Sequence, residues 1–222
     1  MKSHGRALAA FGLIVLSAPG LAWSPKVHER QTRLALALIP RGMASFLSQH
    51  HQALFMAERQ VSAARAPTPE DVEGQFAKVL AISENGRPAS EIVQELGRLA
   101  FMVQLLTDPS AASGPTTVRW VFSGFADGHF DNLVAAREPI VAATGDINPR
   151  QAIQSWSSLK YERFRSLSSH INPHTGEKIG TWDILSVPFA LMQLGFSAGI
   201  NATANIWIYA WRAAGSLWVI QG

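Results

Sequence analysis

Apolar residues recur at helical spacing along almost the whole chain, and this periodicity restricts the fold more than any other feature. In the stretch EIVQELGRLAFMVQLLTD, apolar side chains stand at Ile92, Leu96, Leu99 and Val103, three to four residues apart. No segment shows the strict alternation of apolar and polar residues that is typical of a half-buried strand. The sequence therefore predicts an all-α fold, with one domain of about six to eight helices.

Residues that cap helices mark several of the expected boundaries. Thr68 precedes Pro69 and two acidic residues, and Asn148 precedes Pro149, which is the order found at helix N-termini. Ser90 and Thr181 are expected to cap two further helices. The stretch VRWVFSGFADGHFDNLVAARE is ambiguous at first and is predicted to become helical near Asp127.

The last helical stretch, FSAGINATANIWIYAWRAAGSLWVI, is long and apolar, so a membrane span has to be considered. It contains Asn201, Asn205 and Arg212, which are unfavourable in lipid. A buried helix of a bundle is the better interpretation. Its expected core face consists of Ile200, Ala204, Trp207, Trp211, Ala214 and Trp218.

The first 22 residues are typical of a secretory signal peptide. Lys2 and Arg6 precede an apolar run, and small residues stand at Gly20 and Ala22. The run is too short for a spanning helix, which needs about 20 apolar residues. Cleavage would leave Trp23 as the first residue and residues 23–222 as a secreted or periplasmic domain. An uncleaved membrane anchor is the alternative.

Composition limits what the domain can do. About 200 residues remain after residue 22, which is enough for one complete core. The formal charge of +3 includes Lys2 and Arg6, so residues 23–222 carry about +1, which is weak evidence for nucleic-acid binding. Cysteine is absent, so stability must come from packing, to which 7 Trp and 11 Phe residues contribute.

A free amine at Trp23 would have a chemical use. An α-amine and the carbonyl oxygen of the same residue can chelate a metal ion in a five-membered ring. His28 follows five residues later and offers an imidazole from the first turns of the next helix. Trp23 and His28 are therefore candidate metal ligands.

The chain resembles the all-α zinc-dependent phospholipase C and single-strand nuclease superfamily, whose mature members begin with this Trp and use it with a nearby His. The central family motif is G-x-x-A-H-x-x-x-D-x-x-x-P-x-H, and the chain has LGRLAFMVQLLTDPSA, in which Gly97, Ala100 and Pro109 match. The stretches HERQTRLALALIPRGMASFLSQHHQALF and NATANIWIYAWRAAG also resemble the first helical hairpin and the last helix of the family. The resemblance implies the family's all-α fold and zinc-dependent hydrolysis of phospholipid or nucleic-acid phosphodiesters.

The chain departs from the family at three metal ligands. Phe101, Leu105 and Ala111 stand where the motif has His, Asp and His. Asp71 is a poor match for a further family Asp. Three zinc ions carry six positive charges and need several carboxylates and imidazoles, so this motif cannot hold the family's cluster. Phe101 and Leu105 are expected to fill the former cavity as core residues.

A later family motif places a His and an acid four residues apart on one helix. Asp127 and Asp131 have that spacing, so their carboxylates would share a helix face, with His129 pointing away. The candidate metal set is therefore Trp23, His28, Asp127 and Asp131, holding one zinc ion at most or none, with Asp127 and Asp131 as candidate catalytic residues.

Other candidates have simpler explanations. His170 and His174 lie in the stretch HINPH, where Asn172-Pro173 favours a polar turn. Asn201 begins the glycosylation pattern N-A-T inside an apolar helix. Trp120 and Trp156 could line a groove, although core packing is the simpler interpretation.

Three hypotheses follow. The chain is an exported phospholipase C/nuclease-like protein with a reduced or lost zinc site and weak or no phosphodiesterase activity. Alternatively, it is an active zinc-dependent phosphoesterase, or a non-catalytic binding module of the cell envelope. Whether it is an enzyme is open, no protein partner is predicted, and no spanning helix is expected after cleavage.

Overall fold

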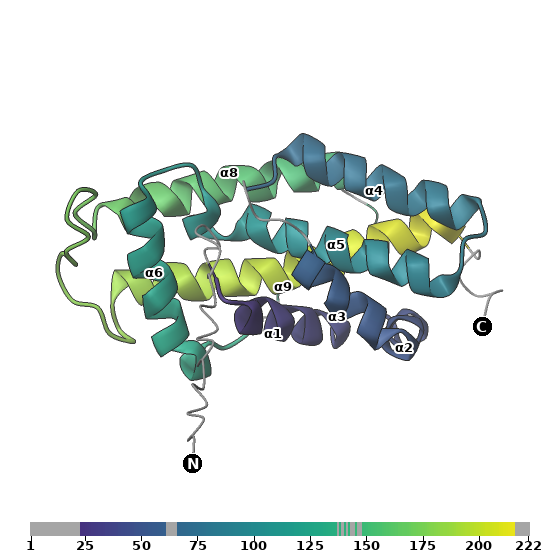
Figure 1. The fold of residues 1–222 in the computed structure, drawn as a ribbon, viewed down its shortest axis with the longest axis horizontal. Coiled ribbons are helices and arrows are strands. Elements are labelled where there is room, and N and C mark those ends of the chain that lie inside the picture. The colour runs from purple at the N-terminus through teal and green to yellow at the C-terminus, as the bar shows by residue number, and fades with distance from the viewer. Residues whose placement is uncertain are drawn as a thin grey trace, which may run out of the picture.

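A computed structural model describes residues 23–60, 66–136, 138, 140, 142, 145 and 148–215 of the chain (Figure 1). These residues form a helical bundle, which confirms the all-α prediction; their β pairing is an isolated antiparallel bridge between Ile171 and Lys178. The helices are α1 (Pro25–Leu36), α2 (Arg41–Gln49), α3 (His51–Gln60), α4 (Pro69–Glu84), α5 (Ala89–Thr107), η1 (Pro109–Ala111), α6 (Thr116–Gly128), η2 (Phe130–Asn132), α8 (Pro149–Ser168) and α9 (Val187–Ala214).

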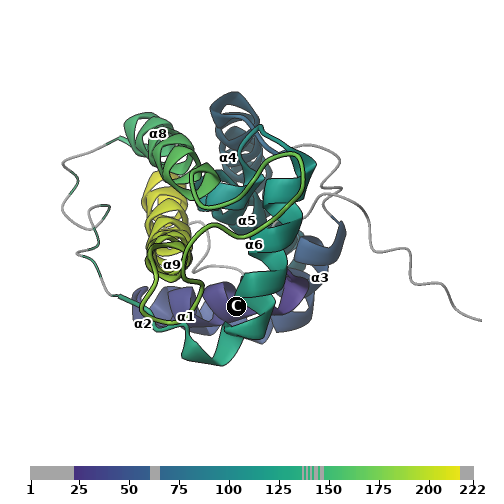
Figure 2. The same cartoon turned by 90° about the vertical axis from the view of Figure 1, so that its left-hand side faces the viewer.

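Helices α5 and α9 lie along the middle of the molecule (Figure 1), with α4 and α8 on one side and α1, α2 and α3 on the other. Helix α6 crosses the end of the bundle that faces the viewer in Figure 2. Helix α9 is buried on all sides from Gly199 to Ala210, and the Trp207 indole Nε1 donates to the Leu96 carbonyl oxygen of α5 at 3.1 Å. The predicted core face of α9 is therefore too narrow, because the whole circumference of the helix is buried there. Trp218 lies outside the described residues.

Two predicted N-caps are confirmed. The Thr68 hydroxyl accepts from the Asp71 amide at 3.2 Å, and the Asp71 carboxylate accepts from the Thr68 amide at 2.8 Å, which forms a complete capping box. The Asn148 side chain accepts from the Gln151 amide at 2.9 Å at the start of α8. Local cap chemistry therefore sets where α4 and α8 begin.

Two other predicted caps are wrong. Helix α5 begins at Ala89, so Ser90 lies inside its first turn, because Pro88 already holds the extended N-cap conformation. Helix α9 begins at Val187 rather than after Thr181, with Ser186 as its cap and Pro188 in the first turn. In both cases a proline decided the boundary.

The predicted helix starting near Asp127 is also wrong. Helix α6 runs from Thr116 to Gly128, so Asp127 lies at its end. Pro115 occupies the N-cap, and the inward residues Val118, Phe122, Phe125 and Ala126 recur at helical spacing. After Gly128 the chain forms the short helix η2, which carries Asp131.

Polar side chains on α9 hold the backbone of Val134, Ala136, Glu138 and Ala142 against the bundle. Gln193, Ser197, Asn201 and Asn205 recur every fourth residue. Their oxygens accept from the backbone amides of Val134 (3.0 Å), Ala136 (3.0 Å), Glu138 (3.4 Å) and Ala142 (2.8 Å), respectively. This amide ladder explains why Asn201 and Asn205 are buried within an apolar helix.

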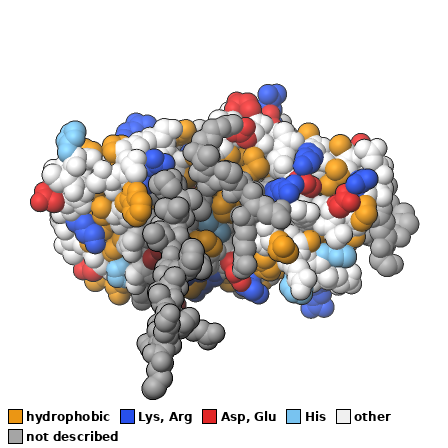
Figure 3. All heavy atoms as spheres, viewed as in Figure 1, with side chains coloured by type: hydrophobic (Ala, Val, Ile, Leu, Met, Phe, Trp, Pro, Cys, Tyr) orange, Lys and Arg blue, Asp and Glu red, His pale blue; other side chains and the backbone are white. Residues whose placement is uncertain are grey.

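Charged side chains of both signs are mixed on the surface. Lys, Arg, Asp and Glu side chains intermingle on the face shown in Figure 3. Among the described helices, none is both long and apolar enough to cross a membrane.

Candidate functional site

His28 lies on α1 and is buried, with 1% of its surface exposed. Its Nδ1 is 2.9 Å from the side-chain oxygen of Gln104 on α5. The Gln104 amide nitrogen donates to the Thr32 hydroxyl at 2.8 Å, so the Gln104 oxygen is left to accept a hydrogen bond from His28 Nδ1–H. The Nε2 atom of His28 then carries a lone pair, and it has no hydrogen-bond partner among the described residues.

Aromatic rings surround this imidazole. The Phe101 ring centroid lies 4.8 Å from that of His28, and the Trp23 centroid lies 6.2 Å away. Phe101, Leu105 and Ala111 are all buried and form their own apolar cluster, against which Ala66 packs. The three residues at the family's ligand positions are therefore core residues, as the sequence analysis expected of Phe101 and Leu105.

Burial sets the protonation state of His28. Removal from water lowers its pKa from 6.5 to about 4, and interactions with the Gln104 and Gln31 side chains offset only part of this effect. The imidazole is consequently neutral at neutral pH. A neutral imidazole with its other nitrogen fixed by a hydrogen bond is the form in which histidine binds metal ions.

Neither of the two predicted carboxylates is buried. Asp127, with 39% of its side chain exposed, faces Lys26 of α1, with 3.9 Å between Oδ1 and Nζ. Asp131 is exposed on η2, beyond the end of α6. The two residues therefore do not occupy one face of a continuous helix, because α6 ends at Gly128. His129 packs its ring on Phe125, with 4.5 Å between centroids.

These residues do not fit a multi-zinc cluster. Such a cluster needs several carboxylate and imidazole donors, and the Phe101, Leu105 and Ala111 side chains have no donor atom. Within the described ranges, no group of three or more His, Asp or Glu side chains is placed to hold a metal ion. The set of Trp23, His28, Asp127 and Asp131 with a single zinc ion stays a prediction, because an α-amine at Trp23 would depend on cleavage within residues outside the description.

The other histidine candidates and Trp120 lie at the surface. His174 is exposed in a turn in which the Asn172 side chain accepts from the His174 amide at 3.0 Å, as the predicted polar turn implies. The His170 carbonyl oxygen accepts from the Ile179 amide at 2.8 Å across the same loop. Trp120 is 57% exposed, so core packing was wrong for that residue.

Sequence reasoning missed a buried acidic group next to the motif. Asp108 has no exposed surface, and its Oδ1 accepts from the Ser110 amide (2.9 Å) and hydroxyl (2.7 Å). Burial raises its pKa from 3.8 to about 7, against the pull of Lys160 on α8. Lys160 is also buried, and burial lowers its pKa. The only sequence signal was an Asp directly before Pro109, which is a frequent capping position.

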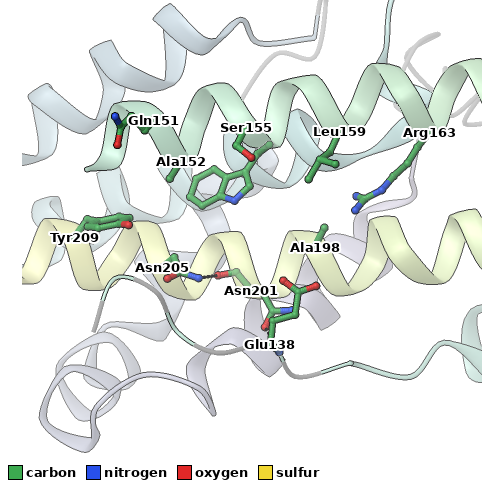
Figure 4. Close-up of a pocket in the computed structure, with 11 residues that line it drawn as sticks. Glu138, Gln151, Ala152, Ser155, Leu159, Arg163, Ala198, Asn201, Asn205 and Tyr209 are labelled. Carbon is green, nitrogen blue, oxygen red and sulfur yellow. Dashed lines mark hydrogen bonds between the residues drawn. The ribbon is translucent and has the colours of Figure 1, made fainter. Parts of the chain in front are cut away.

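A second missed feature is a pocket of about 370 Å³ between α8 and α9. Trp156 of α8 lines it, together with Arg163 of the same helix and Tyr209 of α9 (Figure 4). Trp156 thus lines a groove and also packs against the main core, so both interpretations considered for it hold. Nothing in the local sequence pairs Trp156 with Tyr209, since they lie on different helices.

No protein-family model, curated protein or solved structure matches this chain. The likeness to the phospholipase C and nuclease superfamily therefore rests on the sequence motifs alone.

Proposed function

We propose that this chain is an exported protein of the phospholipase C/nuclease type that has lost its hydrolytic zinc site and acts as a non-catalytic binding module. The observation that carries the proposal is the position of Phe101, whose ring packs 4.8 Å from that of His28 and belongs to a buried apolar cluster with Leu105 and Ala111. A phosphodiester would find no donor there to neutralise its charge or to activate water.

The test begins with the metal content of the exported protein, measured by mass spectrometry after its first residue has been determined. We expect less than one zinc ion per chain and no zinc-dependent hydrolysis of a phosphatidylcholine, single-stranded DNA or bis-nitrophenyl phosphate. Two or more zinc ions with turnover that a chelator abolishes would contradict the proposal.

A gain-of-ligand variant sharpens this test. Phe101→His, Leu105→Asp and Ala111→His together restore the motif's donors beside His28. We expect zinc to raise the melting temperature of the triple variant but not that of the wild type, because a ligand that binds the folded state stabilises it. The same variant with His28→Ala should lose most of the zinc response.

A second candidate is a phosphoesterase with one metal ion. The hydrogen bond from His28 to Gln104 favours it, since it leaves the Nε2 lone pair in the form that a metal would use. Trp23, Asp127 and Asp131 would then complete the site on a phospholipid or nucleic-acid phosphodiester. One zinc ion per chain, lost in His28→Ala together with phosphodiesterase activity, would favour this candidate over the non-catalytic role.

A further inference from the structure

The pocket between α8 and α9 is an elongated groove with a different donor at each end. On α8 its lining extends from Gln151 to Arg163, and on α9 from Ala198 to Tyr209. The two helices run in opposite directions, so Tyr209 lies at one end and Arg163 at the other (Figure 4). Eleven residues of helix correspond to about 16 Å at 1.5 Å per residue. The shape suits an extended small molecule.

Tyr209 supplies an unused donor at one end. The residue is 6% exposed, and its hydroxyl group has no hydrogen-bond partner among the described residues. Burial raises its pKa, so the phenol keeps its proton. A buried hydroxyl without a partner is unfavourable. An acceptor atom of a ligand in the groove would remove this penalty.

Arg163 supplies an unused cationic donor at the other end. Its Nη1 is buried and has no partner within the described part of the chain. In Figure 4 the guanidinium group points from α8 into the space between the two helices. Burial lowers the pKa of Arg163, and the negative charges of Glu138, at the edge of the pocket, and Glu162 oppose this effect. A guanidinium group donates hydrogen bonds readily to a carboxylate, whereas Glu138 would repel a second negative charge on the ligand.

The wall between these ends is largely apolar. The Trp156 indole is partly buried and packs against the main core, and Ala152 and Ala198 have no polar side-chain atom. Asn201 and Asn205 also border the groove, but their amides are engaged by the backbone of Ala136, Glu138 and Ala142. The wall therefore offers a flat ligand an aromatic surface and little competition from water.

We propose that this groove binds an elongated organic monocarboxylate, with its carboxylate on Arg163, its apolar body along Trp156 and an acceptor atom at the Tyr209 hydroxyl. The inference rests on the binding role proposed above and gives that role a ligand class. It is independent of the centre around His28, since no residue of that centre lines the groove.

The test uses the folded exported protein and calorimetric titration with biphenyl-4-carboxylate, its 4′-methoxy derivative and the uncharged biphenyl-4-methanol. We expect the carboxylates to bind at least tenfold more tightly than the alcohol. The methoxy compound should bind more tightly than the parent acid, and biphenyl-4-yl phosphate less tightly. Failure of every carboxylate to bind at millimolar concentration would overturn the proposal.

Three variants assign the contacts. Arg163→Gln should weaken carboxylate binding at least tenfold and leave the alcohol unchanged. Tyr209→Phe should remove only the preference for the methoxy compound, and Glu138→Gln should strengthen binding of the phosphate. Arg165→Gln is the matched control, because Arg165 lies two residues further on α8 and is exposed.

A second readout protects the test against misfolding. Each carboxylate should raise the melting temperature of the wild type more than the alcohol does. Equal shifts, or an Arg163→Gln protein that is folded and binds the acid as the wild type does, would overturn the proposal. Titrations with and without a chelator distinguish failure of the groove proposal from failure of the non-catalytic role. Carboxylate binding that needs zinc would refute the proposed groove site. Chelator-sensitive hydrolysis with unchanged carboxylate binding would refute only the non-catalytic role.

Discussion

The side chain of Gln104 joins His28 to Thr32, accepting from the imidazole Nδ1 at 2.9 Å and donating to the hydroxyl at 2.8 Å. Both partners lie on α1, whereas Gln104 lies on α5. A single amide thus fixes the position of α1 on the central helix and the tautomer of its buried histidine. Polar groups inside a core gain most when every donor and acceptor is used, as Gln104 uses both of its own.

Gln104→Leu should destabilise the fold by about 1–3 kcal/mol, because it leaves His28 Nδ1 and the Thr32 hydroxyl without this partner in the core. Urea unfolding at neutral pH measures the change. Gln154→Leu is the matched control, since Gln154 is exposed on α8, and it should change stability by less than about 0.5 kcal/mol. Equal effects of the two substitutions would contradict the role of Gln104.

His28 should make stability depend on pH. Its pKa is 6.5 when unfolded and about 4 when folded, so the unfolded chain binds the proton more readily between these values. The stability is present above pH 6.5 and is lost as the pH falls towards 4, by about 3 kcal/mol in total. The difference in unfolding free energy between wild type and His28→Leu should therefore shrink on acidification. A constant difference from pH 7.5 to 4 would be inconsistent with a buried neutral imidazole.

Asp108 should make the stability depend on pH in the opposite direction to His28. Its pKa rises from 3.8 to about 7 on folding, so its favourable contribution is present below pH 3.8 and is lost as the pH rises through 7. Asp108→Asn keeps an acceptor for Ser110 and removes the charge. The variant should gain stability relative to the wild type between pH 4 and pH 7.5, measured by the same urea series. A difference between variant and wild type that stays constant from pH 4 to pH 7.5 would contradict the raised pKa of Asp108.

Gly199→Ala should destabilise the protein by about 1–3 kcal/mol, because a Cβ there would collide with the Gln31 side-chain amide. That amide is buried and donates to the Phe196 carbonyl oxygen at 3.0 Å. Gly124→Ala in α6 is the matched control, since nothing lies within 4 Å of its Cβ position. The control should stabilise by about 0.5–1 kcal/mol through helix propensity. Thermal unfolding of both variants would show whether the opposite signs hold.

Ser197→Ala should loosen the attachment of the Ala136 backbone to α9 without unfolding the bundle. The Ser197 hydroxyl accepts from the Ala136 amide at 3.0 Å. Hydrogen exchange at Ala136 should accelerate several-fold, consistent with the loss of about 1 kcal/mol of local protection. The Trp207 indole, bonded to α5, should exchange as in the wild type. Acceleration at both positions would indicate global destabilisation instead.

Features made by neighbouring residues could be predicted from sequence. The capping box joins Thr68 to Asp71, three positions later, and the Asn148 cap involves only Gln151, also three positions later. The predicted starts of α6 and α9 are wrong, because Pro115 holds the N-cap of α6 and the cap Ser186 with Pro188 begins α9. These errors concern boundaries, which local propensity determines poorly.

Contacts between residues far apart in the sequence could not be predicted from local patterns. His28 and Gln104 are 76 residues apart, and the partners in the amide ladder are about 60 apart. A polar residue at every fourth place of α9 was visible in the sequence, but its partner segment was not. The pocket of Trp156 and Tyr209 likewise depends on how two helices pack.

The burial of α9 determines when this protein can fold. Helix α9 is the last described helix of the chain, and it is also the central one, packed against α1, α4, α5 and α8. A nascent chain that lacks residues 187–214 exposes the apolar faces that α9 would cover, so the earlier helices cannot complete their packing until this segment has been synthesised. Until then the earlier helices remain accessible to proteases and chaperones.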